Sequence, residues 1–146
     1  AGVTSVVGRR KYIGNRMHVL KFEKDSTLGA TNAVYSSWPS GAYGYILPLV
    51  GVNLALGYIG AVSGSTICDL EQSNAGAAFT TIFTSQGSSD QRPTIAYNAA
   101  LPTDSGARPE VYLVQPWSRW KGVVDAIPGT ASTDLSLSMV VVEVDQ

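Results

Sequence analysis

The stretch that decides the fold is TASTDLSLSMVVVEVDQ, residues 130–146 of the 146-residue chain. One parity of this stretch holds Leu135, Leu137, Met139 and Val141, and the other holds Ser136, Ser138, Val140, Val142 and Val144. This alternation, followed by a run of β-branched residues, is typical of a β-strand, because successive side chains of a strand point to opposite faces. A helix would need apolar residues three and four positions apart. The sequence therefore predicts a long strand here.

Shorter segments of the same kind precede it, each bounded by Gly, Pro, Ser, Asn or Asp, the residues that suit turns. The predicted strands are 43–47, 52–59, 65–70, 77–84, 94–97 and 110–115. Segments 85–92 and 102–109 predict polar loops, and 24–33 predicts the one short helix. Short strands between turns favour an all-β fold, an antiparallel β-sandwich or barrel, and we expect one domain over residues 1–146.

The most charged stretch is GRRKYIGNRMHV, residues 8–19, which holds four of the ten Lys/Arg residues and the only histidine. It predicts an N-terminal β-hairpin whose arms, 9–13 and 16–22, are joined by Gly14-Asn15. Glycine accepts the positive φ of a two-residue turn, and asparagine tolerates it. On the second arm, His18, Leu20 and Phe22 are expected to share one face, opposite Met17, Val19 and Lys21.

The net charge of −1 gives no reason to expect nucleic acid, membranes or acidic substrates as partners. No run of 18 apolar residues predicts a membrane span, and we expect no signal peptide. Only 14% of the residues are charged, compared with about 25% in a typical soluble domain. A surface with so little charge is weakly protected against association, so the composition favours a protein that assembles with neighbouring subunits.

The charges are unevenly distributed along the chain. The first 24 residues hold six Lys/Arg and one acid, Glu23, whereas the last 22 hold four acids and no Lys or Arg. Two interpretations remain open at this stage. Either the first and last strands pair in one sheet and their charges meet, or the basic end docks on an acidic partner.

Residues capable of catalysis are few. Cys68 is the only cysteine, which excludes an internal disulfide and a cysteine-rich zinc site, and we interpret it as a small buried residue. His18 has no second histidine to help bind a metal, and we interpret it as a strand residue rather than a general base. The sequence also lacks a phosphate-binding glycine loop and a nucleophile elbow. We therefore expect no enzymatic activity, no catalytic or metal-binding residues and no cofactor.

Two motifs allow a functional interpretation beside a structural one. Asp104-Ser105-Gly106-Ala107 resembles the tetrad of retroviral-type aspartic proteases, but the flanking Pro102 and Pro109 favour a turn. Trp117-Ser118-Arg119-Trp120-Lys121 could stack nucleic-acid bases, although the low net charge favours a core or protein-interface role. A carbohydrate-binding β module that uses Trp38, Trp117 or Trp120 also remains open.

The two ends of the chain carry the segments RRKYIGNRM at 9–17 with Leu20-Lys21-Phe22, and Thr133-Asp134-Leu135-Ser136. With these segments, the chain resembles short structural proteins of tailed bacteriophages. The resemblance covers about 30 residues at the ends, and 30–130 departs from any such pattern. It implies a virion component of the capsid decoration (cement) type on the capsid surface. Such a protein binds the lattice of the major capsid protein and forms homo-oligomers, with a trimer expected here; a tail or fibre component is the alternative virion role. The candidate contacts with coat protein or sister subunits are Arg9, Arg10, Lys11, Arg16, Trp117, Arg119 and Trp120.

Overall fold

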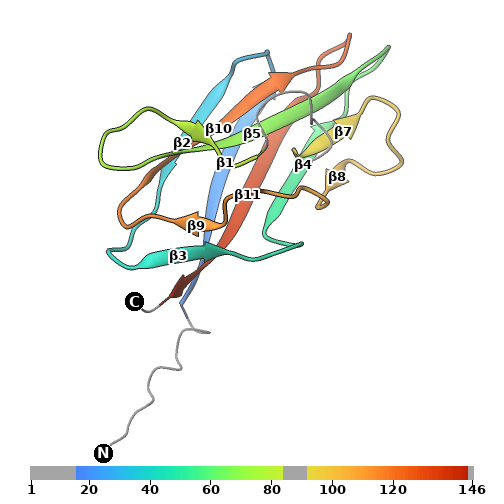
Figure 1. The fold of residues 1–146 in the computed structure, drawn as a ribbon. Helices are drawn as coiled ribbons and strands as arrows, with labels where there is room; N and C mark the ends of the chain where they lie inside the picture. Colours follow the sequence, from blue (N-terminus) through green and yellow to red (C-terminus); the bar gives the residue numbers. More distant parts are fainter. Residues whose placement is uncertain (1–15, 84–91, 145–146) are drawn as a thin grey trace, which may run out of the picture.

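The computed structural model describes residues 16–83 and 92–144, which form two antiparallel β-sheets packed face to face (Figure 1). The described residues contain eleven strands and no helix. The predicted all-β sandwich is therefore confirmed. No helix that could cross a membrane is present in this part of the chain.

The first sheet, which we call the β11 sheet, is built around the C-terminal strand. Its strands are β1 (Met17–Thr27), β3 (Tyr43–Ile46), β4 (Val52–Tyr58), β8 (Thr103–Asp104), β9 (Leu113–Val114) and β11 (Thr133–Val144). One edge of β11 pairs with β1 over nearly its whole length. Its other edge pairs first with β4 and then with β3, which carry β8 and β9 on their far sides. The first and last strands thus lie in one sheet, as one of the two charge interpretations required.

The second sheet, which we call the β5 sheet, covers the other side of the core. Its strands are β2 (Ala33–Ser37), β5 (Ser65–Ser73), β6 (Thr80–Thr81), β7 (Thr94–Ala96) and β10 (Arg119–Ala126). The order is β2-β10-β5, and β5 also pairs with the short strands β6 and β7.

The core lies between the two sheets. The alternation of β11 is confirmed, because Leu135, Leu137, Met139 and Val141 are each 2% exposed or less. Two tryptophans, Trp38 and Trp120, are fully buried in the same cluster. Burying an aromatic side chain removes a large apolar area from water, so these two contribute strongly to the stability of so small a protein.

Six segments predicted as strands overlap β3, β4, β5, β6, β7 and β9, with shifted ends. The prediction of a short helix within 24–33 is wrong, because β1 continues to Thr27 and a turn follows it. Strands β2, β8 and β10 were not predicted. The second arm of the predicted hairpin is the start of β1, whereas Arg9 to Ile13 and the Gly14-Asn15 turn lie outside the described residues.

Candidate functional site

The outer face of the β11 sheet carries a row of apolar side chains that crosses four strands. Met17 of β1 pairs with Val142 of β11, Val142 pairs with Tyr45 of β3, and Tyr45 pairs with Leu113 of β9. Because side chains at paired positions lie on the same face of a sheet, the four are neighbours. Met17, Tyr45 and Leu113 are 52%, 42% and 39% exposed, although large apolar side chains are usually buried.

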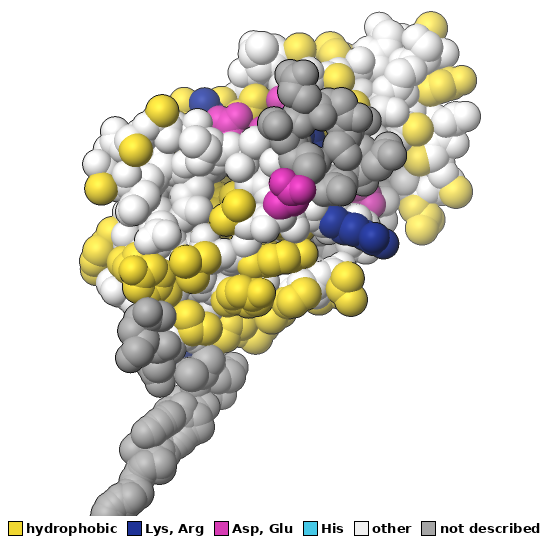
Figure 2. Space-filling view, in the orientation of Figure 1, with side chains coloured by type: hydrophobic (Ala, Val, Ile, Leu, Met, Phe, Trp, Pro, Cys, Tyr) yellow, Lys and Arg dark blue, Asp and Glu magenta, His cyan; other side chains and the backbone are white. Residues whose placement is uncertain are grey.

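A second apolar row lies beside the first. Val19 of β1 pairs with Val140 of β11, and the backbone N–H of Leu47 donates to the Val140 carbonyl. We call the two rows together the apolar face; its members are Met17, Val19, Tyr45, Leu47, Leu113, Val140 and Val142. Figure 2 shows hydrophobic side chains gathered along the lower part of the molecule, in the region that β3 and β9 occupy in Figure 1.

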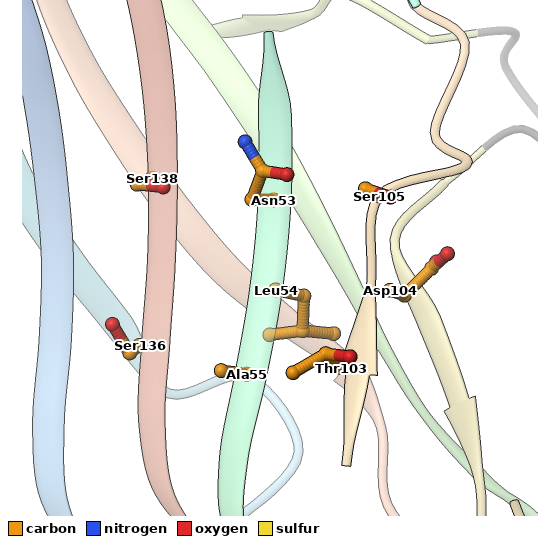
Figure 3. Close-up of a pocket in the computed structure, with 8 residues that line it drawn as sticks. All are labelled: Asn53, Leu54, Ala55, Thr103, Asp104, Ser105, Ser136 and Ser138. Atoms are coloured by element: carbon orange, nitrogen blue, oxygen red, sulfur yellow. The ribbon is translucent and has the colours of Figure 1, made fainter. Parts of the chain in front are cut away.

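The other half of the same sheet face is polar and hollowed. A pocket of about 290 Å³ is lined mainly by Ser136 and Ser138 of β11, Asn53 and Ala55 of β4, and the chain from Thr103 to Ser105 (Figure 3). Next to it, the Ser136 hydroxyl donates to Glu23 Oε2 over 3.3 Å. Hydroxyl and amide groups of this kind can bind a polar ligand by hydrogen bonds.

The carboxylate of Asp104 is already bound by its own chain. Its Oδ2 accepts a hydrogen bond from the backbone N–H of Thr94, and its Oδ1 accepts one from the N–H of Gly106, both over 2.8 Å. In Figure 3, Asp104 projects to the side of β8 away from Ser136 and Ser138. This is the hydrogen bonding of a turn, which agrees with the structural interpretation of the tetrad.

The basic N-terminal stretch meets the acidic C-terminal strand at Glu143. His18 Nε2 donates to Glu143 Oε2 over 2.6 Å, and Arg16 Nη2 forms an ion pair with Oε1 over 2.7 Å. Burial acts to raise the pKa of Glu143, but the hydrogen bond from His18 and the charge of Arg16 outweigh it, and the pKa lies below its ordinary value. The ring of His18 also contacts Trp38 edge to face. His18 is thus a strand residue with satisfied contacts.

The outer face of the β5 sheet differs from the apolar face because charged side chains on it pair with one another. Arg92 lies 2.6 Å from Asp125 and 3.9 Å from Asp69, and the Thr81 hydroxyl donates to Asp69. Burial raises the pKa of Asp69 to about 6 and also raises that of Asp125. Lys121 pairs with Glu71, which lies opposite it on β5. These contacts join β5, β10 and the segment before β7, so the cluster has a structural place in the fold.

The predicted contact residues lie in very different environments. Trp117 is 69% exposed in a turn, with a positive φ of 56°. Arg119 is exposed on the β5 sheet, with its guanidinium 5.9 Å from the centre of the Tyr35 ring. Arg16 is half exposed and paired with Glu143. Arg9, Arg10 and Lys11 lie outside the described residues.

Trp120 must be removed from the set of contact residues. It is fully buried between the sheets, and its indole N–H donates to the Ser118 hydroxyl. Trp38 is equally buried, and its indole N–H donates to the Ala42 carbonyl. A sugar or a base could stack on neither ring, so only Trp117 of the three tryptophans is accessible.

The apolar face was missed from the sequence, although a pattern for it existed. Val140, Val142 and Val144 make both parities of β11 apolar near its end, and Met17 and Val19 do the same for the start of β1. A strand that is apolar on both parities is apolar on both faces. Which strands lie side by side, and hence that the residues form one surface, depends on the register of the sheet.

The described residues offer little for catalysis. Within the described residues, 16–83 and 92–144, no group of three or more His, Cys, Asp or Glu side chains could hold a metal ion. Cys68 is fully buried, as predicted, and burial together with the charges of Asp125 and Asp69 raises the pKa of its thiol to about 12. A thiol with so high a pKa is not a nucleophile at neutral pH.

The sequence matches no protein-family model and no curated protein sequence. The fold is similar to that of a chain in a solved structure described as the capsid of Ralstonia phage GP4. The similarity covers 89% of this chain and 86% of that one, with a TM-score of 0.50 and 12% sequence identity. At this level of identity, the comparison establishes a shared fold.

Proposed function

We propose that this protein is a non-enzymatic structural component of a bacteriophage capsid, a decoration protein that binds the lattice of the major capsid protein. The observation that carries the proposal is the fold shared with a phage capsid chain over 89% of the length. The resemblance of both chain ends to phage structural proteins supports it independently.

The surface supports an assembling role. Large apolar side chains are exposed in turns as well as on the apolar face: Leu49, Val62, Leu101 and Trp117 are each at least 66% exposed. Leu49, Val62 and Trp117 also have a positive φ, a conformation that L-residues rarely adopt. Such strained and exposed apolar positions are typical of interaction sites.

Trp117 is the proposed centre of the contact with the shell, with Arg119 beside it. Tryptophan and arginine are the residues most often found to dominate binding energy at interfaces. Arg16 and the residues Arg9, Arg10 and Lys11 are proposed to add electrostatic attraction, which salt would screen.

The test is co-sedimentation of the purified protein with shells assembled from the coat protein of the same genome, before and after expansion. We expect attachment to expanded shells, weakened at least about tenfold by Trp117→Ala. Tyr58→Ala is the matched control, because Tyr58 is an aromatic residue that is 45% exposed, pairs with Thr133 at the start of β11 and is not among the proposed contact residues. Failure to attach to either form of the shell would contradict the proposed function.

A further inference from the structure

The apolar face is unpartnered in the described chain and differs in kind from the rest of the surface. Its seven side chains carry no charge, and the charged residues that border it on the same side of the sheet are Lys21 and Glu23 of β1. The opposite face of the sandwich carries ion pairs beside the exposed Tyr35. A contiguous apolar surface is a common mark of a protein–protein contact.

We propose that the apolar face packs against the same face of a second copy of this chain. The shape supports a copy as the occupant: the surface belongs to a β-sheet, and two sheet faces pack well when their side chains interdigitate about 10 Å apart. Every copy carries such a face. Contact between identical faces is the isologous arrangement of most homodimers, and it replaces the trimer that the resemblance implied.

The electrostatics also support a second copy. Two identical charged surfaces would repel each other, whereas this face has no charge and the whole chain carries only −1. The polar half of the same sheet, with Lys21, Glu23, Ser136 and Ser138, borders the apolar face directly. An apolar centre with a polar rim is the general organisation of protein interfaces.

The size of the face fits this role. Met17, Val19, Tyr45 and Leu113 are each at least 39% exposed and lie at neighbouring positions, so the exposure is contiguous rather than scattered. Leu49, Val50 and Val111, which are 72%, 59% and 43% exposed, lie close along the chain to Leu47 and Leu113 and would extend the contact. A stable interface buries about 800 Å² on each partner, so the proposed contact includes these flanking side chains.

The ring of Tyr45 lies near the middle of the face, in contact with Tyr112 at a centroid distance of 5.7 Å. Tyr45→Lys would place a charge on each side of the contact. Tyr58→Lys is a matched control, because Tyr58 is 45% exposed, belongs to the same sheet and lies at the Thr133 end of β11. Both sites are exposed enough to accept lysine without loss of the fold, which thermal unfolding checks.

The experiment is analytical ultracentrifugation of the full chain and both variants from about 1 to 100 µM. We expect the natural chain to self-associate, Tyr45→Lys to weaken association at least about tenfold, and Tyr58→Lys to leave it unchanged. Met17→Lys, at the other end of the same row, should act like Tyr45→Lys.

A chain that stays monomeric at about 100 µM would overturn the proposal. So would an oligomer that both Tyr45→Lys and Met17→Lys leave intact. A monomer whose attachment to shells is lost with Tyr45→Lys would show that the coat protein covers this face, which overturns self-contact but supports the proposed function. Self-association that depends on Tyr45, in a protein that ignores shells, would support self-contact and contradict the proposed function.

Discussion

Gly44 determines how closely β3 packs on the core. A Cβ atom at this position would lie 2.5 Å from Cγ1 of Val141 and 2.9 Å from the ring of Trp38. No real Cβ atom makes such contacts without movement of its neighbours. The absence of a side chain therefore lets the buried tryptophan lie against the strand.

Gly44→Ala is expected to lower the free energy of unfolding by about 1–3 kcal/mol, the usual effect of overpacking a core. Urea unfolding followed by tryptophan fluorescence measures it. Gly29→Ala is the control, because its Cβ would meet only the Asn32 side chain at 3.6 Å. Equal effects of the two substitutions would show that the packing around Gly44 can relax.

The three tryptophans show how far the burial of a single side chain can be predicted from the sequence. Trp38 and Trp120 are buried, whereas Trp117 is exposed, although all three stand near turn residues in the sequence. The sequence around Trp120 alternates outward Arg119 and Lys121 with inward residues, which is a strand pattern. The same residues also alternate aromatic and cationic side chains, a combination that interfaces favour, so the sequence left both a core role and an interface role open for Trp120.

At the scale of strands, the pairing of β1 with β11 brings the basic N-terminal region next to the acidic C-terminal strand. Glu143 accepts from His18 and faces Arg16, so one buried carboxylate of β11 fixes the start of β1. The lowered pKa of Glu143 means that the folded protein favours its ionised form. This contribution to stability is present above the ordinary pKa of 4.5 and is lost as the pH falls through the lower pKa of the folded state.

Glu143→Gln is therefore expected to lower the free energy of unfolding by about 1–2 kcal/mol at pH 7, since a hydrogen bond to a charged group is lost. The difference from the natural chain should shrink as the pH falls from 4.5, where the carboxyl of the unfolded chain becomes protonated, through the lower pKa of the folded state. Urea unfolding at pH 7 and at pH 3 measures it. Glu23→Gln, at an exposed position, is the control. A difference that stays constant with pH would contradict the role assigned to the ionised carboxylate.

Most strands were predictable from the sequence, but the eight-residue β10 and the short strands β2 and β8 were not. The alternation along β11 indicated its inward residues correctly because its two faces have different environments for most of its length. Strands β2 and β8 are short and lie at sheet edges, where alternation is weak and few neighbours impose a pattern. The helix predicted within 24–33 failed because pairing with β11 extends β1 to Thr27 despite the local preference.

At the scale of the whole molecule, the two outer faces of the sandwich have different characters. One face carries ion pairs beside the exposed Tyr35, and the other divides into the apolar face and a largely polar pocket. Low overall charge favours an assembling protein from the sequence alone, but it does not predict the surface that would be used. The apolar face proposed for this role depends on the register of four strands, 17–27, 43–46, 113–114 and 133–144, which only the fold brings together.

The central claim is that this polypeptide functions as a structural unit on a phage head. Cryo-electron microscopy of purified virions tests it most directly. The account predicts density for this two-sheet domain on the outside of the head, at repeated positions over the coat lattice, with Trp117 at the contact with the coat protein. Density for the domain at the tail or fibres only, or no copy of the chain in the virion, would contradict it.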